Sequence, residues 1–133
     1  MFLGEYYTNF TGQGRVVLPR KIRQELGDEK EIILSRGFER CIWGFARQSW
    51  EKEAEKQLEA PITDPAARDL RRYLFSAAEI VGLDEQGRFV IPRALLEYAD
   101  LKEGVTIIGA GDHFEIWDRE IWKKYITKLT KEN

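Results

Sequence analysis

Two arginines stand in the same local context at two places in this chain, and arginine chemistry suits phosphates and base edges. Arg15 follows Gly14 and Arg88 follows Gly87, with an offset of 73 residues. A guanidinium group carries planar N–H donors that match phosphate oxygens and the acceptors of guanine. Single arginines in exposed turns are also common surface residues. Their repetition at the same place is therefore what favours a role in binding nucleic acid.

The two arginines belong to a short segment that is written twice, over residues 14–20 and 87–93. Each copy holds a glycine, an arginine, a β-prone apolar run and a proline followed by arginine. Glycine adopts turn conformations that are closed to other residues, so we assign a turn-forming role to Gly14 and Gly87. Proline suits the first position of a helix, where its missing N–H would be unpaired. Each copy therefore predicts a turn, a strand and a helix start.

More basic residues follow the first arginine turn, namely Arg20, Lys21 and Arg23, and Arg93 repeats Arg20 in the second copy. These side chains could line a rim that faces DNA or could simply solvate a helix, and the sequence leaves both interpretations open. The formal net charge is only -2, so no global basic excess points to nucleic acid. A nucleic-acid role therefore depends on the local clustering of charge.

Several classes of protein lack support in this sequence. The single cysteine, Cys41, excludes an internal disulfide and is compatible with a reducing cytoplasm. His113 is the only histidine and has no second histidine or cysteine pair to complete a metal site. We therefore predict no catalytic residues, no metal and no cofactor. No apolar run approaches the roughly 20 residues of a membrane span, and the N-terminus does not resemble a signal peptide, so we expect a cytoplasmic protein with no membrane partner.

Apolar periodicity predicts the same order of elements in both copies. The expected strands cover residues 2–10, 15–18, 32–34, 41–43, 78–83, 88–91, 105–108 and 114–117. The expected helices start at Pro19, Ser49, Asp64, Pro92 and Asp118, the three polar residues acting as caps. We expect the first two strands of each copy to form a hairpin, and the four tryptophans to pack in the core or at an interface.

The duplication predicts three segments. A first module covers residues 1–50, connecting helices cover 51–78, and a second module with a C-terminal helix covers 79–133. A unit of roughly 50–60 residues buries only about 60% of its unfolded surface. Each module is therefore expected to share its core with the other one or with further chains, which makes a homo-oligomer a reasonable expectation.

The chain resembles the MraZ family, bacterial regulators within the AbrB-like superfamily. The resemblance rests on the opening residues 1–6, on the two Gly-Arg turns with their proline helix starts, and on the ending at residues 114–118. A further motif of the family, Asp-x-x-Gly-Arg, is present at residues 84–88. The first copy departs from it, because Thr11 stands where the second copy has Asp84.

The resemblance implies an α+β fold in which two tandem AbrB-like swapped-hairpin modules pack as one pseudo-dimeric, barrel-like domain with flanking helices. It also implies a sequence-specific, DNA-binding transcriptional regulator associated with the nucleoid. Such a regulator binds short direct repeats of double-stranded DNA as a ring-shaped homo-oligomer, in the promoter of the division and cell-wall gene cluster. Arg15 and Arg88 become the expected DNA contacts, while Asp84 is expected to orient its turn or Arg88.

A second hypothesis keeps the ring but assigns it to another class of protein. In that case the chain is a structural or protein-interaction module without specific DNA binding, and its tryptophan-bearing surfaces contact protein partners. Under the DNA-binding hypothesis we expect both arginine turns on one face. The first turn has the denser basic charge, so we expect it to supply more of the attraction to phosphates.

Overall fold

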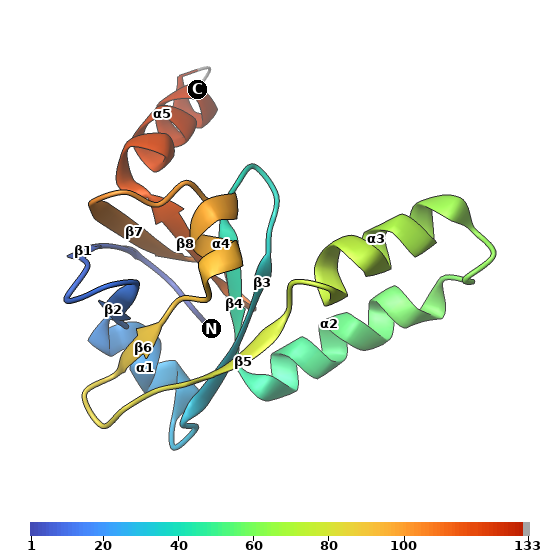
Figure 1. Cartoon of the computed structure of the whole chain (residues 1–133), viewed down its shortest axis with the longest axis horizontal. Helices are drawn as coiled ribbons and strands as arrows, with labels where there is room; N and C mark the ends of the chain where they lie inside the picture. Colours follow the sequence, from blue (N-terminus) through green and yellow to red (C-terminus); the bar gives the residue numbers. More distant parts are fainter. Residues whose placement is uncertain (132–133) are drawn as a thin grey trace.

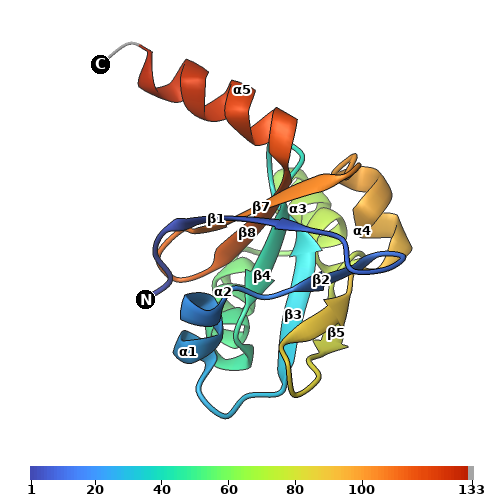
Figure 2. The same ribbon diagram turned by 90° about the vertical axis from the view of Figure 1, so that its left-hand side faces the viewer.

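The computed structural model describes residues 1–131, and over these residues the chain forms eight strands and five helices. The expected α+β class is confirmed. Six strands make one antiparallel sheet in the order β1-β7-β8-β4-β3-β5, and β2 and β6 form a separate two-stranded ribbon. The sheet is open, with β1 and β5 as its edge strands (Figures 1 and 2).

The strands have these bounds: β1 Glu5–Asn9, β2 Arg15–Val17, β3 Glu31–Arg36, β4 Ile42–Phe45, β5 Glu79–Gly82, β6 Arg88–Val90, β7 Gly104–Gly109 and β8 Phe114–Asp118. The helices are α1 Arg20–Leu26, α2 Arg47–Glu59, α3 Pro65–Phe75, α4 Arg93–Tyr98 and α5 Arg119–Thr130. Every strand and helix expected from the sequence is present in the predicted order. None of these helices, within residues 1–131, is long and apolar enough to cross a membrane.

The expected hairpins within each copy are wrong, because the strands pair across the two copies instead. β1 pairs with β7, β5 pairs with β3, and β2 pairs with β6. Within the first copy, β1 and β2 are linked only locally, by backbone bonds such as the one from Thr11 N to Arg15 O at 2.8 Å. The two copies have the same apolar pattern, so that pattern is compatible with either partner and does not by itself select pairing within one copy.

The ribbon shows how this exchange joins the halves. Val16 lies opposite Phe89, its counterpart in the other copy, and both side chains are buried. They share one core with the apolar residues of the two short helices, among them Ile22 and Leu95. This core contains residues from both halves, as expected for modules too small to bury enough surface alone.

The helix starts differ slightly from the predicted ones. Pro19 and Pro92 occupy the position before the helix rather than its first residue. α2 starts after Ala46, so the predicted cap at Ser49 is wrong. Arg47 and Gln48 are good helix formers and extend the helix toward its N-terminus. Asp118 caps α5 as predicted, because its side chain accepts hydrogen bonds from Glu120 N and Ile121 N.

The remaining helices extend away from the sheet. α2 and α3 form a helical hairpin that projects to one side of the molecule in Figure 1, while α5 projects from the opposite end of the sheet. Arg71 holds the connection between α2 and α3 by donating to the carbonyls of Ala60 at 2.5 Å and Leu58 at 3.3 Å. Trp122 of α5 is buried together with Trp117 of β8 and with Cys41.

The ribbon core generates a stability prediction. Replacing Phe89 by alanine should lower the free energy of unfolding by about 3–5 kcal/mol, because it leaves a cavity where the two halves meet. Its neighbour Val90 is 49% exposed on the outer face. The control Val90→Ala should therefore cost less than about 1 kcal/mol. Denaturant unfolding of both variants measures the difference, and equal costs would contradict the assignment of Phe89 to the shared core.

Candidate nucleic-acid interface

The outward face of the β2–β6 ribbon presents the two repeated arginines. In the ribbon Arg15 lies opposite Val90, and Val17 lies opposite Arg88. Successive side chains of a strand point to opposite faces, and Val16 and Phe89 point into the core. The four remaining ribbon residues therefore share the outer face, with the arginines at diagonal corners. Along the strand direction the arginines are about 7 Å apart.

The second turn fixes Arg88 through a carboxylate. Oδ1 of Asp84 accepts hydrogen bonds from the backbone N–H groups of Gln86 at 2.9 Å and Arg88 at 2.8 Å. Oδ2 accepts from Nε of Arg88 at 2.6 Å. The backbone and side-chain hydrogen bonds from Arg88 hold the pKa of Asp84 below its ordinary value. The carboxylate thus shapes the turn and orients the guanidinium group, whose terminal nitrogens take part in no hydrogen bond among residues 1–131.

The first turn has no equivalent of this carboxylate. The hydroxyl of Thr11 donates to the carbonyl of Arg15 over 3.4 Å, which is a weak contact. Among residues 1–131, the exposed guanidinium of Arg15 takes part in no ion pair or side-chain hydrogen bond. Gly14 and Gly87 nevertheless share a positive φ, at 69° and 78°, so both turns use the backbone freedom of glycine.

The other basic residues of the predicted site differ in their roles. Arg20 and Lys21 are exposed on the first turn of α1. Arg93 is exposed at the start of α4 and forms an ion pair with Glu97 at 3.3 Å. Arg23 is engaged within the protein, because it donates to the carbonyls of Gln86 at 2.8 Å and Glu85 at 3.1 Å. The structure therefore brings Arg15 and Arg88 together on the ribbon and commits Arg23 to supporting the second turn.

The predicted nucleic-acid contacts did not include the apolar residues between the arginines. Val17 and Val90 lie on the outer face of the ribbon, and apolar side chains can contact the methyl group of thymine. Val16 and Val17 are neighbours in the predicted strand, so their side chains must point to opposite faces. If one is buried the other is exposed, and this was the available signal in the sequence.

Cys41 and His113 lie away from the ribbon. Burial, followed by the proximity of Glu115, raises the pKa of the Cys41 thiol. Burial lowers the pKa of His113, but its hydrogen bonds with Glu115 and Asp112 outweigh this and raise it overall. The ring of His113 stacks on the ring of Phe45, with the ring centroids 5.4 Å apart. Within residues 1–131 there is no group of three or more acidic, histidine or cysteine side chains arranged to hold a metal ion.

The carboxylate of Asp84 generates a pH prediction. Its pKa is depressed in the folded protein, so the ordering that it provides is present at neutral pH and is lost as pH falls through the folded pKa, below the ordinary value of 3.8. Amide hydrogen exchange at Gln86 and Arg88, corrected for its intrinsic pH dependence, should therefore accelerate in that window. In an Asp84→Ala variant the exchange should be fast already at pH 7, and slow exchange there would contradict the role of Asp84.

The repeated structure agrees with a comparison to known families. One family model, described as MraZ protein, antitoxin-like, matches this chain twice, over residues 1–73 and over residues 74–133. The two matches cover both arginine turns and both sets of exchanged strands. This chain therefore belongs to the MraZ family and contains two tandem copies of its domain.

Proposed function

We propose that this protein is a transcriptional regulator that binds double-stranded DNA through the outward face of the β2–β6 ribbon. The observation that carries the proposal is the display of Arg15 and Arg88 at equivalent positions on one face. A two-stranded antiparallel ribbon has the right width to enter the major groove, where arginine recognises guanine and apolar side chains contact thymine. Membership of the MraZ family supports a regulator-like role.

The surrounding charge supports contacts to the phosphate backbone. Arg20 and Lys21 are exposed beside the ribbon at the start of α1, and Arg93 occupies the same place at the start of α4. Such residues position a protein on DNA without reading its sequence. Arg23 has a different role, because its hydrogen bonds keep the turn before Arg88 in place.

We propose that several copies of the chain form a ring that binds short direct repeats in the promoter of the division and cell-wall gene cluster. The overall charge is -2, so one ribbon offers only a modest attraction to DNA. Linking several weak contacts can raise the overall affinity by about 10²–10⁴ without any new contact, when the geometry allows them to engage together. Exposed apolar residues on the α2–α3 hairpin and on β5, namely Leu58, Ile62 and Ile80, offer surface for contacts between copies.

A ring that only binds other proteins is the alternative, and the same exposed apolar residues favour it. The tryptophans give it less support than the sequence suggested. Trp117 and Trp122 are buried against each other, with ring centroids 5.2 Å apart, and Trp50 packs on Phe45 and Phe75. An enzymatic role also has little basis, because a buried thiol with a raised pKa is a poor nucleophile at neutral pH.

A binding titration over several salt concentrations tests the proposed function. With the protein's own upstream DNA, the double variant Arg15→Ala/Arg88→Ala should bind more weakly and show a smaller salt dependence. Removal of one phosphate contact should reduce the slope of log K against log salt concentration by about one unit. Removal of one base contact should reduce the discrimination against a wrong base by about 1–3 kcal/mol. Lys124→Ala on α5 removes one exposed charge away from the ribbon and should change little. Unchanged binding by the double variant would favour the alternative.

The two arginines should not contribute equally. Arg15 is free of ion pairs within residues 1–131, whereas Arg88 shares its charge with Asp84, whose carboxylate repels phosphates. Arg15→Ala should therefore weaken DNA binding more than Arg88→Ala. The chain offers a direct control: Thr11→Asp gives the first turn the carboxylate of the second and should also weaken binding. If Arg88→Ala has the larger effect, or Thr11→Asp strengthens binding, this explanation of the asymmetry is wrong.

A further inference from the structure

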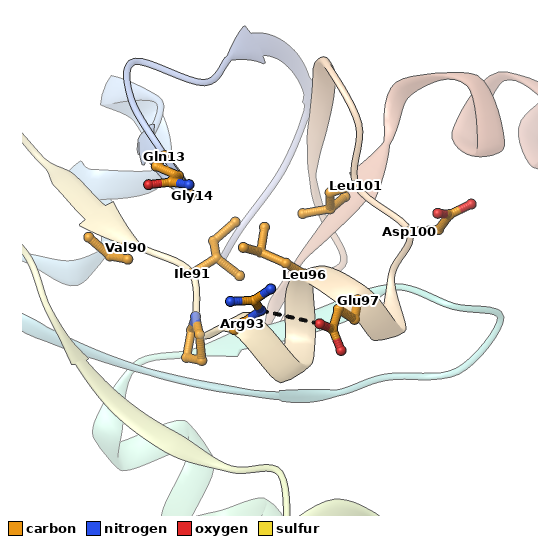
Figure 3. A pocket seen from close by; sticks show the side chains of 10 residues that line it. Gln13, Gly14, Val90, Ile91, Arg93, Leu96, Glu97, Asp100 and Leu101 are labelled. Atoms are coloured by element: carbon orange, nitrogen blue, oxygen red, sulfur yellow. Dashed lines mark hydrogen bonds and ion pairs between the residues drawn. The ribbon is translucent and has the colours of Figure 1, made fainter.

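A groove opens beside the first arginine turn, between that turn and α4. It has a volume of about 630 Å³ and is lined by Gly14, by Val90 and Ile91 at the end of the ribbon, and by Leu96 and Leu101 around α4. Figure 3 shows Leu96 and Leu101 pointing toward the Gly14 turn, with the Arg93–Glu97 ion pair beside them. We call this the Gly14 groove.

The equivalent place, between the second arginine turn and α1, is occupied by the side chain of Arg23. Position 23 corresponds to position 96, and Gly87 corresponds to Gly14. Arg23 lies so close to Gly87 that a Cβ on this glycine would overlap the arginine's Cδ. Its guanidinium group binds the carbonyls of Gln86 and Glu85. The turn before Arg88 is therefore held by a cation that comes from the first half.

In the Gly14 groove that cation is missing. Of the two corresponding carbonyls, that of Gly12 accepts a hydrogen bond from Arg15 N at 3.3 Å, and the other is free among the described residues. Leu96 replaces the arginine, and a Cβ on Gly14 would lie 3.2 Å from Cδ1 of Leu96. The carbonyl of Gln13 is the counterpart of the Gln86 carbonyl. Within residues 1–131 it accepts no hydrogen bond.

The charge around the groove also differs from that at the corresponding positions, because more of the positions that line the groove are acidic. Two neutral residues of the first half, Gln24 and Gly27, are replaced by Glu97 and Asp100, which both line the groove. The one acidic residue at these positions of the first half, Asp28, is replaced by Leu101. The second half therefore has no counterpart of the internal arginine and carries acidic residues at the edge of an apolar groove.

We propose that the Gly14 groove binds an arginine side chain carried by a segment of a partner protein. The second arginine turn shows that this backbone arrangement accepts a guanidinium group, whose donors match neighbouring carbonyls. The methylene stem of an arginine would pack on Val90 and Leu96, as such stems do on apolar surface. The groove is larger than one side chain, and its apolar lining extends to Leu101 and so accommodates apolar neighbours of the arginine within a peptide.

Charges already at the groove leave room for this arginine. Arg93 forms an ion pair with Glu97. Asp100 forms another with Lys102, whose Nζ lies 3.8 Å from the carboxylate Oδ2. These pairs are exposed, and exposed pairs are individually weak. The first half also has an arginine at the position of Arg93, namely Arg20, and it still accommodates Arg23. A bound partner would hold the turn that carries Arg15 as Arg23 holds the turn that carries Arg88.

A peptide titration on the full chain tests this proposal without any DNA. The probe is acetyl-Leu-Arg-Leu-amide, and its matched control carries the neutral isostere citrulline in place of arginine. Adding the arginine peptide should shift the NMR signals of Gly14, Val90 and Leu96. The citrulline peptide should bind at least about five-fold more weakly, because hydrogen bonds to a charged group are stronger.

Variants locate the site. Glu97→Gln/Asp100→Asn replaces two exposed side chains and should weaken binding of the arginine peptide by about 2- to 10-fold. The charge-matched control Glu51→Gln/Asp69→Asn on the α2–α3 hairpin should not. Leu96→Arg should fill the groove from within the chain, abolish peptide binding and slow amide exchange at Gly14 and Arg15.

Three results would overturn the proposal. One is equal binding of the arginine and citrulline peptides, and another is no binding of either. The third is a set of Gly14-groove signals that shift with protein concentration and not with peptide, since a second copy of this chain would then occupy the groove. Because no DNA is present, failure here is separate from failure of the DNA-binding proposal.

Discussion

The register of β2 against β6 is the constraint on which the rest of the molecule depends. It places Val16 opposite Phe89, and these two buried side chains join the halves at the centre of the shared core. Because strand residues alternate between faces, the same register directs Arg15 and Arg88 outward. A slip of one residue would bury the arginines and expose the core residues. The core and the candidate interface are therefore fixed by a single set of backbone hydrogen bonds.

The halves share a backbone plan but differ in how rigidly they hold their arginines. The turn before Arg88 is supported twice, by its own Asp84 and by Arg23 from the other half. The turn before Arg15 has Thr11 and Leu96 at the corresponding places and lacks both supports. One arginine is thus preorganised and the other can adapt, so a single ribbon combines a fixed guanidinium group with an adaptable one.

The elements could be predicted well because each copy repeats strong local signals. Paired glycines and prolines locate the turns and the helix starts, and the acidic cap of α5 is visible at Asp118. Strand pairing was harder to predict. Identical alternation in both copies does not determine whether β2 pairs with β1 or with β6. The burial of Val16 against Phe89 decides it.

The fine structure of the site was predictable only in part. The Asp-x-x-Gly-Arg motif pointed to Asp84 as the residue that orients Arg88, whereas the engagement of Arg23 with Gln86 crosses from one half to the other and has no signal in either copy alone.

The exchange of strands also has a consequence for synthesis of the chain. β1 is made well before its partner β7, which lies about 100 residues later in the chain. At a synthesis rate of about 5–20 residues per second, β1 waits on the order of ten seconds for its partner. During that time β1 lacks its native partner, and unpaired strands of this kind are prone to aggregate. Completing the second half therefore protects the nascent first half as well as completing the sheet.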